Sequence, residues 1–256
     1  MKRKGHRLFF DYLAACLQGI AGLVLIWAFH VPWSALLDTG SPWKIFGLGT
    51  IAAFANISFL WLIYKLFPKV FVNLDKENQT LAVYLTQLSH VHLFSLMALT
   101  SVAEEIFFRA FIQTLLIQWW SSVPLGIGGA AAIFTALHVR FFKTPGLLLS
   151  GFMVGLSTGF LFWYTGNIWA SVWGHFLYNV LLVIISNILI EKRKLVDREA
   201  VSGTLPGRTE FVGETKDVPN NHLNLKRDWK NQWSRFVVGF MVGLVITIAV
   251  LVWLTR

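Results

Sequence analysis

Hydrophobic positions gather in blocks long enough to cross a bilayer, and short polar stretches separate these blocks. A helix needs about 20 mainly apolar residues to span a hydrocarbon core of roughly 30 Å. Helices are also a form in which a membrane-embedded backbone satisfies its own hydrogen bonds. The pattern therefore predicts an all-α, polytopic bundle of about seven transmembrane helices. The expected spans are residues 8–29, 45–66, 91–120, 125–138, 146–164, 168–190 and 236–254.

The same pattern divides the chain into four parts. Residues 1–90 hold two spans and a lead-in helix at 81–90, and residues 91–190 form a membrane core. Residues 191–235 are polar and basic, contain glycine and proline, and show no clear apolar period, so we expect a cytoplasmic loop. Residues 236–256 hold the last span.

Composition excludes an ordinary soluble domain. The chain is 55% hydrophobic and 14% charged, whereas soluble domains average about 25% charged residues. Its one cysteine, Cys16, leaves no disulfide framework or cysteine metal site. The net charge is +9, and alternating the crossings places the Lys/Arg clusters on one side. This distribution predicts a cytoplasmic N-terminus and contact with anionic lipid, and not a nucleic-acid partner.

Three ionisable residues lie inside the apolar run that leads to Trp120. Glu104, Glu105 and Arg109 are costly at membrane depth, which makes them functional candidates. Glu105 precedes Arg109 by four residues, the favourable order for an ion pair within a helix. Glu104 points about 100° away, onto the stripe shared with Phe108. We therefore expect Arg109 to hold Glu105 while Glu104 stays free to react.

Two later spans also carry polar groups. His138 follows Phe134 by four residues, and Asn179 follows His175 by four, so each pair shares a helix face. One acid, two imidazoles and one amide can activate water and stabilise an oxyanion. However, His138 ends its span, whereas His175 lies early in a span running the same way. Tilted or offset helices must bring the two histidines level.

Three short motifs resemble those of the CPBP intramembrane proteases. This family includes the CAAX-processing Rce1 enzymes and bacterial bacteriocin-immunity proteins. The resemblance covers roughly residues 93–190, including the turn at 165–169, and leaves out the first two spans and the last. The three motifs are Glu104-Glu105-x-x-x-Arg109, Phe134-x-x-x-His138 and His175-x-x-x-Asn179.

The resemblance implies an intramembrane endopeptidase that acts on a peptide or a membrane-protein precursor. In that reaction Glu104 would take a proton from water, and His138 would help to position the water. His175 and Asn179 would donate hydrogen bonds to the tetrahedral oxyanion. The residues matched to these roles come from three separate predicted spans.

The resemblance leaves the question of a metal open. Glu104, His138 and His175 could supply a zinc site of two histidines and one carboxylate, with one position left for water. The sequence has no H-E-x-x-H motif. A zinc-dependent reaction and a metal-free, glutamate-driven reaction are therefore both compatible with these residues.

Supporting roles follow from the same resemblance. Arg109 would hold Glu105 ionised, and Phe134 would pack beside the site. The match to bacterial members implies an integral protein of a bacterial plasma membrane. A CAAX substrate does not follow, because such members need not have prenylated partners.

Two other functions use the same polar residues. A non-catalytic immunity or scaffold protein could retain the polar site for binding. A proton-coupled transporter could use Glu104 and the histidines as a relay, although the chain lacks the paired inverted repeats that many transporters show. Peptide cleavage that depends on Glu104 separates the protease from both alternatives.

Overall fold

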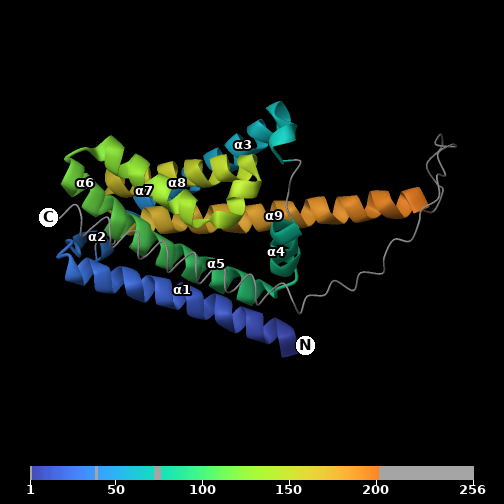
Figure 1. The fold of residues 1–256 in the computed structure, drawn as a ribbon, viewed down its shortest axis with the longest axis horizontal. Coiled ribbons are helices and arrows are strands. Elements are labelled where there is room, and N and C mark those ends of the chain that lie inside the picture. Colours follow the sequence, from blue (N-terminus) through green and yellow to red (C-terminus); the bar gives the residue numbers. More distant parts are fainter. Residues whose placement is uncertain (1, 38–39, 72–75, 202–256) are drawn as a thin grey trace. The chain divides into compact units, whose positions relative to one another are not determined.

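The computed structural model describes residues 2–37, 40–71 and 76–201, and every regular element within these ranges is helical (Figure 1). Two segments are wider π-helices (η1 and η3), and two are 3-10 helices (η2 and η4). The predicted all-α architecture is confirmed. The elements are α1 (Lys2–Ala28), α2 (Ser34–Leu37), η1 (Trp43–Gly47), α3 (Leu48–Leu66), η2 (Pro68–Phe71), α4 (Lys76–Thr86), α5 (His90–Glu105), η3 (Ile106–Gln113), α6 (Thr114–Trp120), α7 (Val123–Leu137), η4 (Val139–Lys143), α8 (Pro145–Thr165) and α9 (Ile168–Val201).

Within the described ranges, five helical segments are long and apolar enough to cross a membrane, and five of the expected spans correspond to them. Helix α7 is apolar but shorter than these segments. The span predicted at 236–254 lies outside the described residues. The five long segments are His6–Ala28, Trp43–Leu66, His90–Trp120, Pro145–Thr165 and Ile168–Ile188.

The ends of two helices differ from the prediction. The lead-in helix α4 ends at Thr86, and Ser89 then caps α5, accepting a hydrogen bond from the backbone N–H of His92 at 3.4 Å. Helix α9 continues to Val201, so residues 191–201 are helical where the sequence predicted a loop. This stretch contains no glycine or proline and is rich in residues with high helix propensity.

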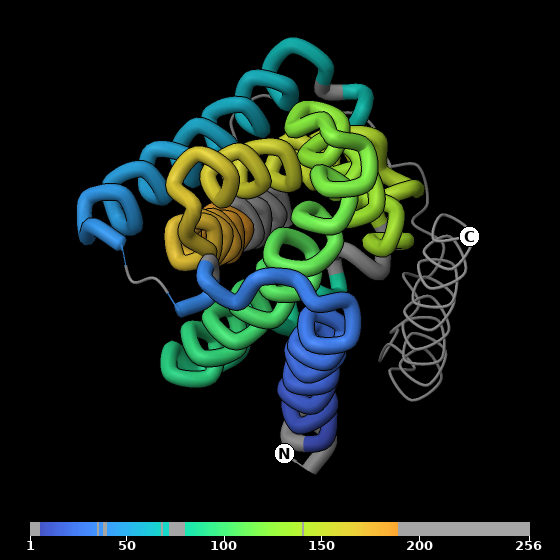
Figure 2. The backbone as a smooth tube through the Cα atoms, turned by 90° about the vertical axis from the view of Figure 1, so that its left-hand side faces the viewer, coloured from blue at the N-terminus to red at the C-terminus, as the bar shows by residue number. Residues whose placement is uncertain are grey.

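Close helix contacts organise the membrane-spanning part. Helix α1 lies against α5 and η3, α7 packs on α6 and α8, and α3 packs on α8 (Figures 1 and 2). Glycines permit the nearest approaches, since a Cβ on Gly155 would lie 3.0 Å from the Cα of Ala131 in α7. A Cβ on Gly49 of α3 would lie 2.8 Å from the carbonyl oxygen of Ala170 in α9.

Hydrogen bonds between polar side chains also join pairs of helices. Asn56 of α3 is buried, and its Nδ2 donates to Ser157 Oγ of α8 at 2.7 Å. At the other side of the bundle, Tyr84 of α4 donates through its hydroxyl to Asp11 Oδ2 of α1 at 2.8 Å. The Arg7 guanidinium lies 3.9 Å from the centroid of the same ring. Burial and the nearby Asp11 carboxylate raise the pKa of Tyr84 above its ordinary value.

Candidate active site

A column of buried polar side chains runs along α5 and η3. Ser101, Glu105, Arg109 and Gln113 recur at intervals of four residues, and each is 0% exposed. The last two lie in the π-helix, a rare form that is frequent at functional sites. The helix therefore presents a polar edge to the interior of an otherwise apolar bundle.

Glu105 has a partner on each carboxylate oxygen. Arg109 Nε donates to Oε2 at 3.1 Å, so the ion pair expected from the sequence is present. His175 Nδ1 donates to Oε1 at 2.8 Å, and its ring is buried. The second contact joins residues far apart in the chain, and no local spacing could predict it.

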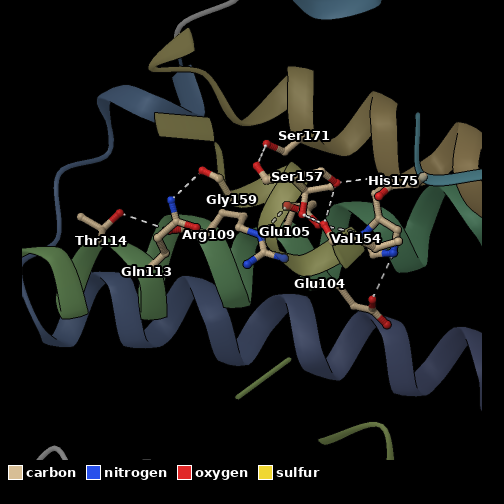
Figure 3. Close-up of polar contacts among 12 residues, drawn as sticks. Glu104, Glu105, Arg109, Gln113, Thr114, Val154, Ser157, Gly159, Ser171 and His175 are labelled. Atoms are coloured by element: carbon tan, nitrogen blue, oxygen red, sulfur yellow. Dashed lines mark hydrogen bonds and ion pairs between the residues drawn. The ribbon is translucent and has the colours of Figure 1, made fainter. Parts of the chain in front are cut away.

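Glu104 reaches the same imidazole from its other side. Its Oε2 lies 3.6 Å from His175 Nε2, so His175 lies between the two glutamates (Figure 3). The sequence predicted Glu104 as the free carboxylate, but in the structure it faces a histidine. The side chain of Glu104 keeps 12% exposure, whereas that of Glu105 keeps none. Glu104 is thus the more accessible of the two to water or substrate.

His138 ends helix α7 and turns back onto it. Its Nδ1 lies 2.8 Å from the carbonyl oxygen of Phe134. A carbonyl only accepts, so Nδ1 carries the hydrogen, and the neutral ring has its lone pair on Nε2. The ring also stacks on Phe141, with centroids 5.0 Å apart. These contacts set both the tautomer and the orientation of the imidazole.

Phe134 joins the three predicted motifs. Its ring centroid lies 4.5 Å from that of His138 and 5.9 Å from that of His175. It also lies 5.1 Å from the Phe108 centroid and 5.6 Å from the Arg109 guanidinium carbon. Both histidine rings thus lie beside the same aromatic ring, so α7 and α9 bring the two histidines to a similar depth in the bundle. The contact is made one turn before the end of the short helix α7.

A tight turn sets the start of α9. Gly166 has a φ of +63°, which favours glycine, and Asn167 Oδ1 accepts from the N–H of Trp169 at 2.7 Å. This cap places His175 two turns into the helix. Asn179 follows one turn later and is half-buried. Among the described residues its side chain makes no hydrogen bond, so the structure does not join it to the glutamates.

The donor atoms do not fit the zinc set that the sequence left open. In residues 2–37, 40–71 and 76–201, no three His, Cys, Asp or Glu side chains gather closely enough to hold a metal ion. In this arrangement both ring nitrogens of His175 face glutamates, and Nδ1 of His138 is hydrogen-bonded to the Phe134 carbonyl.

An apolar groove of about 460 Å³ runs along other faces of the two site helices. Its lining includes no titratable side chain, so the glutamate and histidine cluster does not line this groove. The lining residues come from η1, α5 and α9: Ile45, Phe46, Ala98, Val102, Trp169, Val172, Trp173 and Phe176.

Two members of the polar column were not predicted from the sequence. Ser101 and Gln113 are uncharged, and neither belongs to the three motifs. Their spacing from Glu105 and Arg109 was the signal that could have found them, because residues four apart share a helix face. Gln113 Nε2 donates to the carbonyl oxygen of Gly159 at 2.9 Å, which ties η3 to α8 (Figure 3).

Comparison with known protein families gives a match to part of the chain. Residues 86–181 match the sequence model of the family described as type II CAAX prenyl endopeptidase Rce1-like. The match includes all three motifs, and α1 and α3 precede it. Searches of curated proteins and of solved structures gave no match. With its long apolar helices the chain is an integral membrane protein, and residues 86–181 are similar to the Rce1-like family of CPBP intramembrane proteases.

Proposed function

We propose that the protein is an intramembrane endopeptidase in which Glu104 activates water to hydrolyse a peptide bond. The substrate class is a peptide or a membrane-protein precursor. One observation carries the proposal: His175 lies between Glu104 and Glu105, at 3.6 Å and 2.8 Å. This arrangement gives one carboxylate for proton transfer and a second that orients the imidazole.

Glu104 is suited to the role of general base. It is the more accessible of the two carboxylates, and no arginine ion pair engages it among the described residues. A base must come within hydrogen-bond reach of the water that it deprotonates. Glu104 would take the proton as the water oxygen attacks the scissile carbonyl carbon, and would later return it to the leaving amine nitrogen.

His175 is suited to stabilising the tetrahedral intermediate. Its Nδ1–H donates to Glu105, which would stabilise the positive charge of an imidazolium. Its Nε2–H would then point toward the space beside Glu104, where the oxyanion forms. One such donor contributes about 2.7–4 kcal/mol to the transition state. We assign Asn179, one turn along α9, as a second donor once substrate is bound.

His138 would position the attacking water. Its hydrogen bond to the Phe134 carbonyl leaves the lone pair on Nε2, so this nitrogen can accept a hydrogen from water. Phe134 packs between the two imidazoles and would limit how far either can rotate. The Glu105–Arg109 pair is a positioning element, because Glu105 acts through His175.

Glu104→Gln tests the proposal. The amide keeps the shape of the side chain but cannot act as a base, and we expect cleavage to fall about 10²–10⁴-fold. Membranes from cells expressing wild type or variant are compared by mass spectrometry of newly formed peptide ends. Because the proposed reaction uses Glu104 and no metal ion, a chelator should leave wild-type cleavage unchanged.

Asp11→Asn is the matched control. It makes the same carboxylate-to-amide change on another membrane helix, where Asp11 faces Tyr84. We expect it to cleave like wild type. If Glu104→Gln folds and yields the same peptide ends as wild type, the glutamate mechanism is wrong. If wild type yields no new ends at all, the immunity or scaffold alternative gains support.

A further inference from the structure

Four polar atoms of the buried column have no hydrogen-bond partner among the described residues, and Ser101 Oγ is one of them. Both terminal nitrogens of Arg109, Nη1 and Nη2, and the amide oxygen of Gln113 are buried without a hydrogen bond among the described residues. Unpaired polar atoms are costly in a protein interior, and more so when the group is charged. The Phe134 ring, 5.6 Å from the guanidinium carbon, offers Arg109 a cation–π contact but no hydrogen-bond acceptor.

The unpaired atoms are complementary. The guanidinium supplies N–H donors, Gln113 supplies an acceptor, and the two residues lie four apart on one helix face. The assignment of the amide is secured by Gly159, because only Nε2 can donate to its carbonyl oxygen, which lies 2.9 Å away. Oε1 must therefore be the unpaired atom.

The chemistry of these atoms favours water over an anion. Glu105 already balances the charge of Arg109, and the negative end of the Gln113 amide would repel a second anion. Water accepts from the guanidinium and donates to Oε1 at once. Buried waters in proteins typically make about three such hydrogen bonds. We propose that the Arg109 guanidinium and the Gln113 side-chain amide bind an internal water molecule between η3 and α8.

Gly159 preserves the geometry of this water site. A Cβ at position 159 would lie 2.6 Å from Gln113 Oε1 and would push the amide away. The water site would hold Arg109 against Glu105 and, through Glu105, would orient His175. This last consequence rests on the proposed protease function, whereas the binding of water does not.

X-ray hydroxyl-radical footprinting of the full-length protein in ¹⁸O-labelled water tests the site. Radicals formed from bound water mark neighbouring side chains, and Phe134 is the reporter beside Arg109. Phe111, 0% exposed, is the reference ring. We expect Phe134 to be labelled several-fold faster than Phe111 in wild type. Equal labelling of the two rings would overturn the proposal, even if no variant folds.

Gln113→Met removes both the acceptor and the hydrogen bond from Nε2 to Gly159 while keeping the length of the side chain, and should reduce Phe134 labelling several-fold. Thr114→Val is the control, because it removes only the hydrogen bond from Thr114 Oγ1 to the Arg109 carbonyl. Unchanged Phe134 labelling in folded Gln113→Met would also overturn the water site. This comparison separates the site from any water near Glu104, which Gln113 does not contact.

A second pair of variants changes two glycines of α8, one beside the water site and one away from it. Gly159→Ala should displace Gln113 Oε1 and reduce Phe134 labelling, whereas Gly155→Ala presses on Ala131 instead and should not. Equal labelling in both variants would contradict the proposal. Peptide cleavage is measured in parallel. If the wild type does not cleave peptides, the proposed protease function is wrong. The footprinting result would still test the water site.

Discussion

At the residue scale, His175 is the side chain on which both glutamates converge. Its Nδ1 donates to the fully buried Glu105, and its Nε2 faces the more accessible Glu104. Two adjacent acids in one helix thus acquire different surroundings. Glu105 is enclosed by Arg109 and His175, whereas the side chain of Glu104 keeps 12% exposure.

Arg109→Leu should destabilise the protein strongly. Removing one partner of a buried ion pair leaves the other charge uncompensated, at a cost of about 3–5 kcal/mol in the free energy of unfolding. Denaturant titration in one detergent measures the effect. Lys65→Leu, an exposed cation on α3, is the control and should change stability by about 0.5 kcal/mol or less. Similar losses in both variants would contradict a special role for the buried pair.

Tyr84 gives a pH dependence outside the membrane spans. Its pKa in the folded protein is raised, first by burial and then by the Asp11 carboxylate. The stabilising contribution of the neutral hydroxyl is therefore complete below the unfolded pKa of about 10 and is lost as the pH rises further. Melting temperatures from pH 8 to 11 should fall more steeply for wild type than for Tyr84→Phe. Parallel curves would refute this linkage.

The sequence predicted local relations between residues better than distant ones. The Glu105–Arg109 pair follows from a spacing of four within one helix, and it is present. The contact of Glu105 with His175 depends on how α9 packs against α5, which no spacing encodes. For the same reason Glu104 was predicted free but faces His175. The roles of these residues in catalysis remain predictions until Glu104→Gln is measured.

At the element scale, α7 and α8 depend on glycine for their close contact. Gly155 would place a Cβ 3.0 Å from the Ala131 backbone, whereas a Cβ on Gly128 of α7 would meet nothing within 4 Å. Gly155→Leu should therefore separate the helices and lower the melting temperature. Gly128→Leu should leave it unchanged or raise it, since leucine favours helix over glycine. Equal melting temperatures would contradict the packing argument.

The order of the long apolar helices could be predicted, because blocks of apolar residues determine it. Their ends were harder to predict. Helix α9 continues past the apolar block to Val201. The residues after the block are polar but still have high helix propensity. The π-helix η3 was not predicted, because its wider turns depend on how the polar column packs and leave no mark on hydropathy.

At the scale of the whole molecule, the positions of Lys and Arg predict which loops face the cytoplasm. We expect the loop after α1 to lie outside and the turn after α7 inside. Cys16 is the only cysteine, so single-cysteine variants in a Cys16→Ser background can test this. An impermeant thiol reagent should label Ser41→Cys in intact cells, and Lys143→Cys only after permeabilisation. The reverse pattern would invert the predicted topology.

The π-helix η3 has a consequence for chain length. A π-turn contains about one residue more than the α-turn it replaces. The segment between Glu105 and Gln113 therefore contains more residues than a regular α-helix of the same length would. Deleting a single apolar residue there, such as Ile112, could let an ordinary helix form. The rest of the span would then rotate by about 100° relative to Glu105, and Gln113 would turn away from Gly159. The contact of Gln113 with Gly159 thus depends on the wider turns of η3.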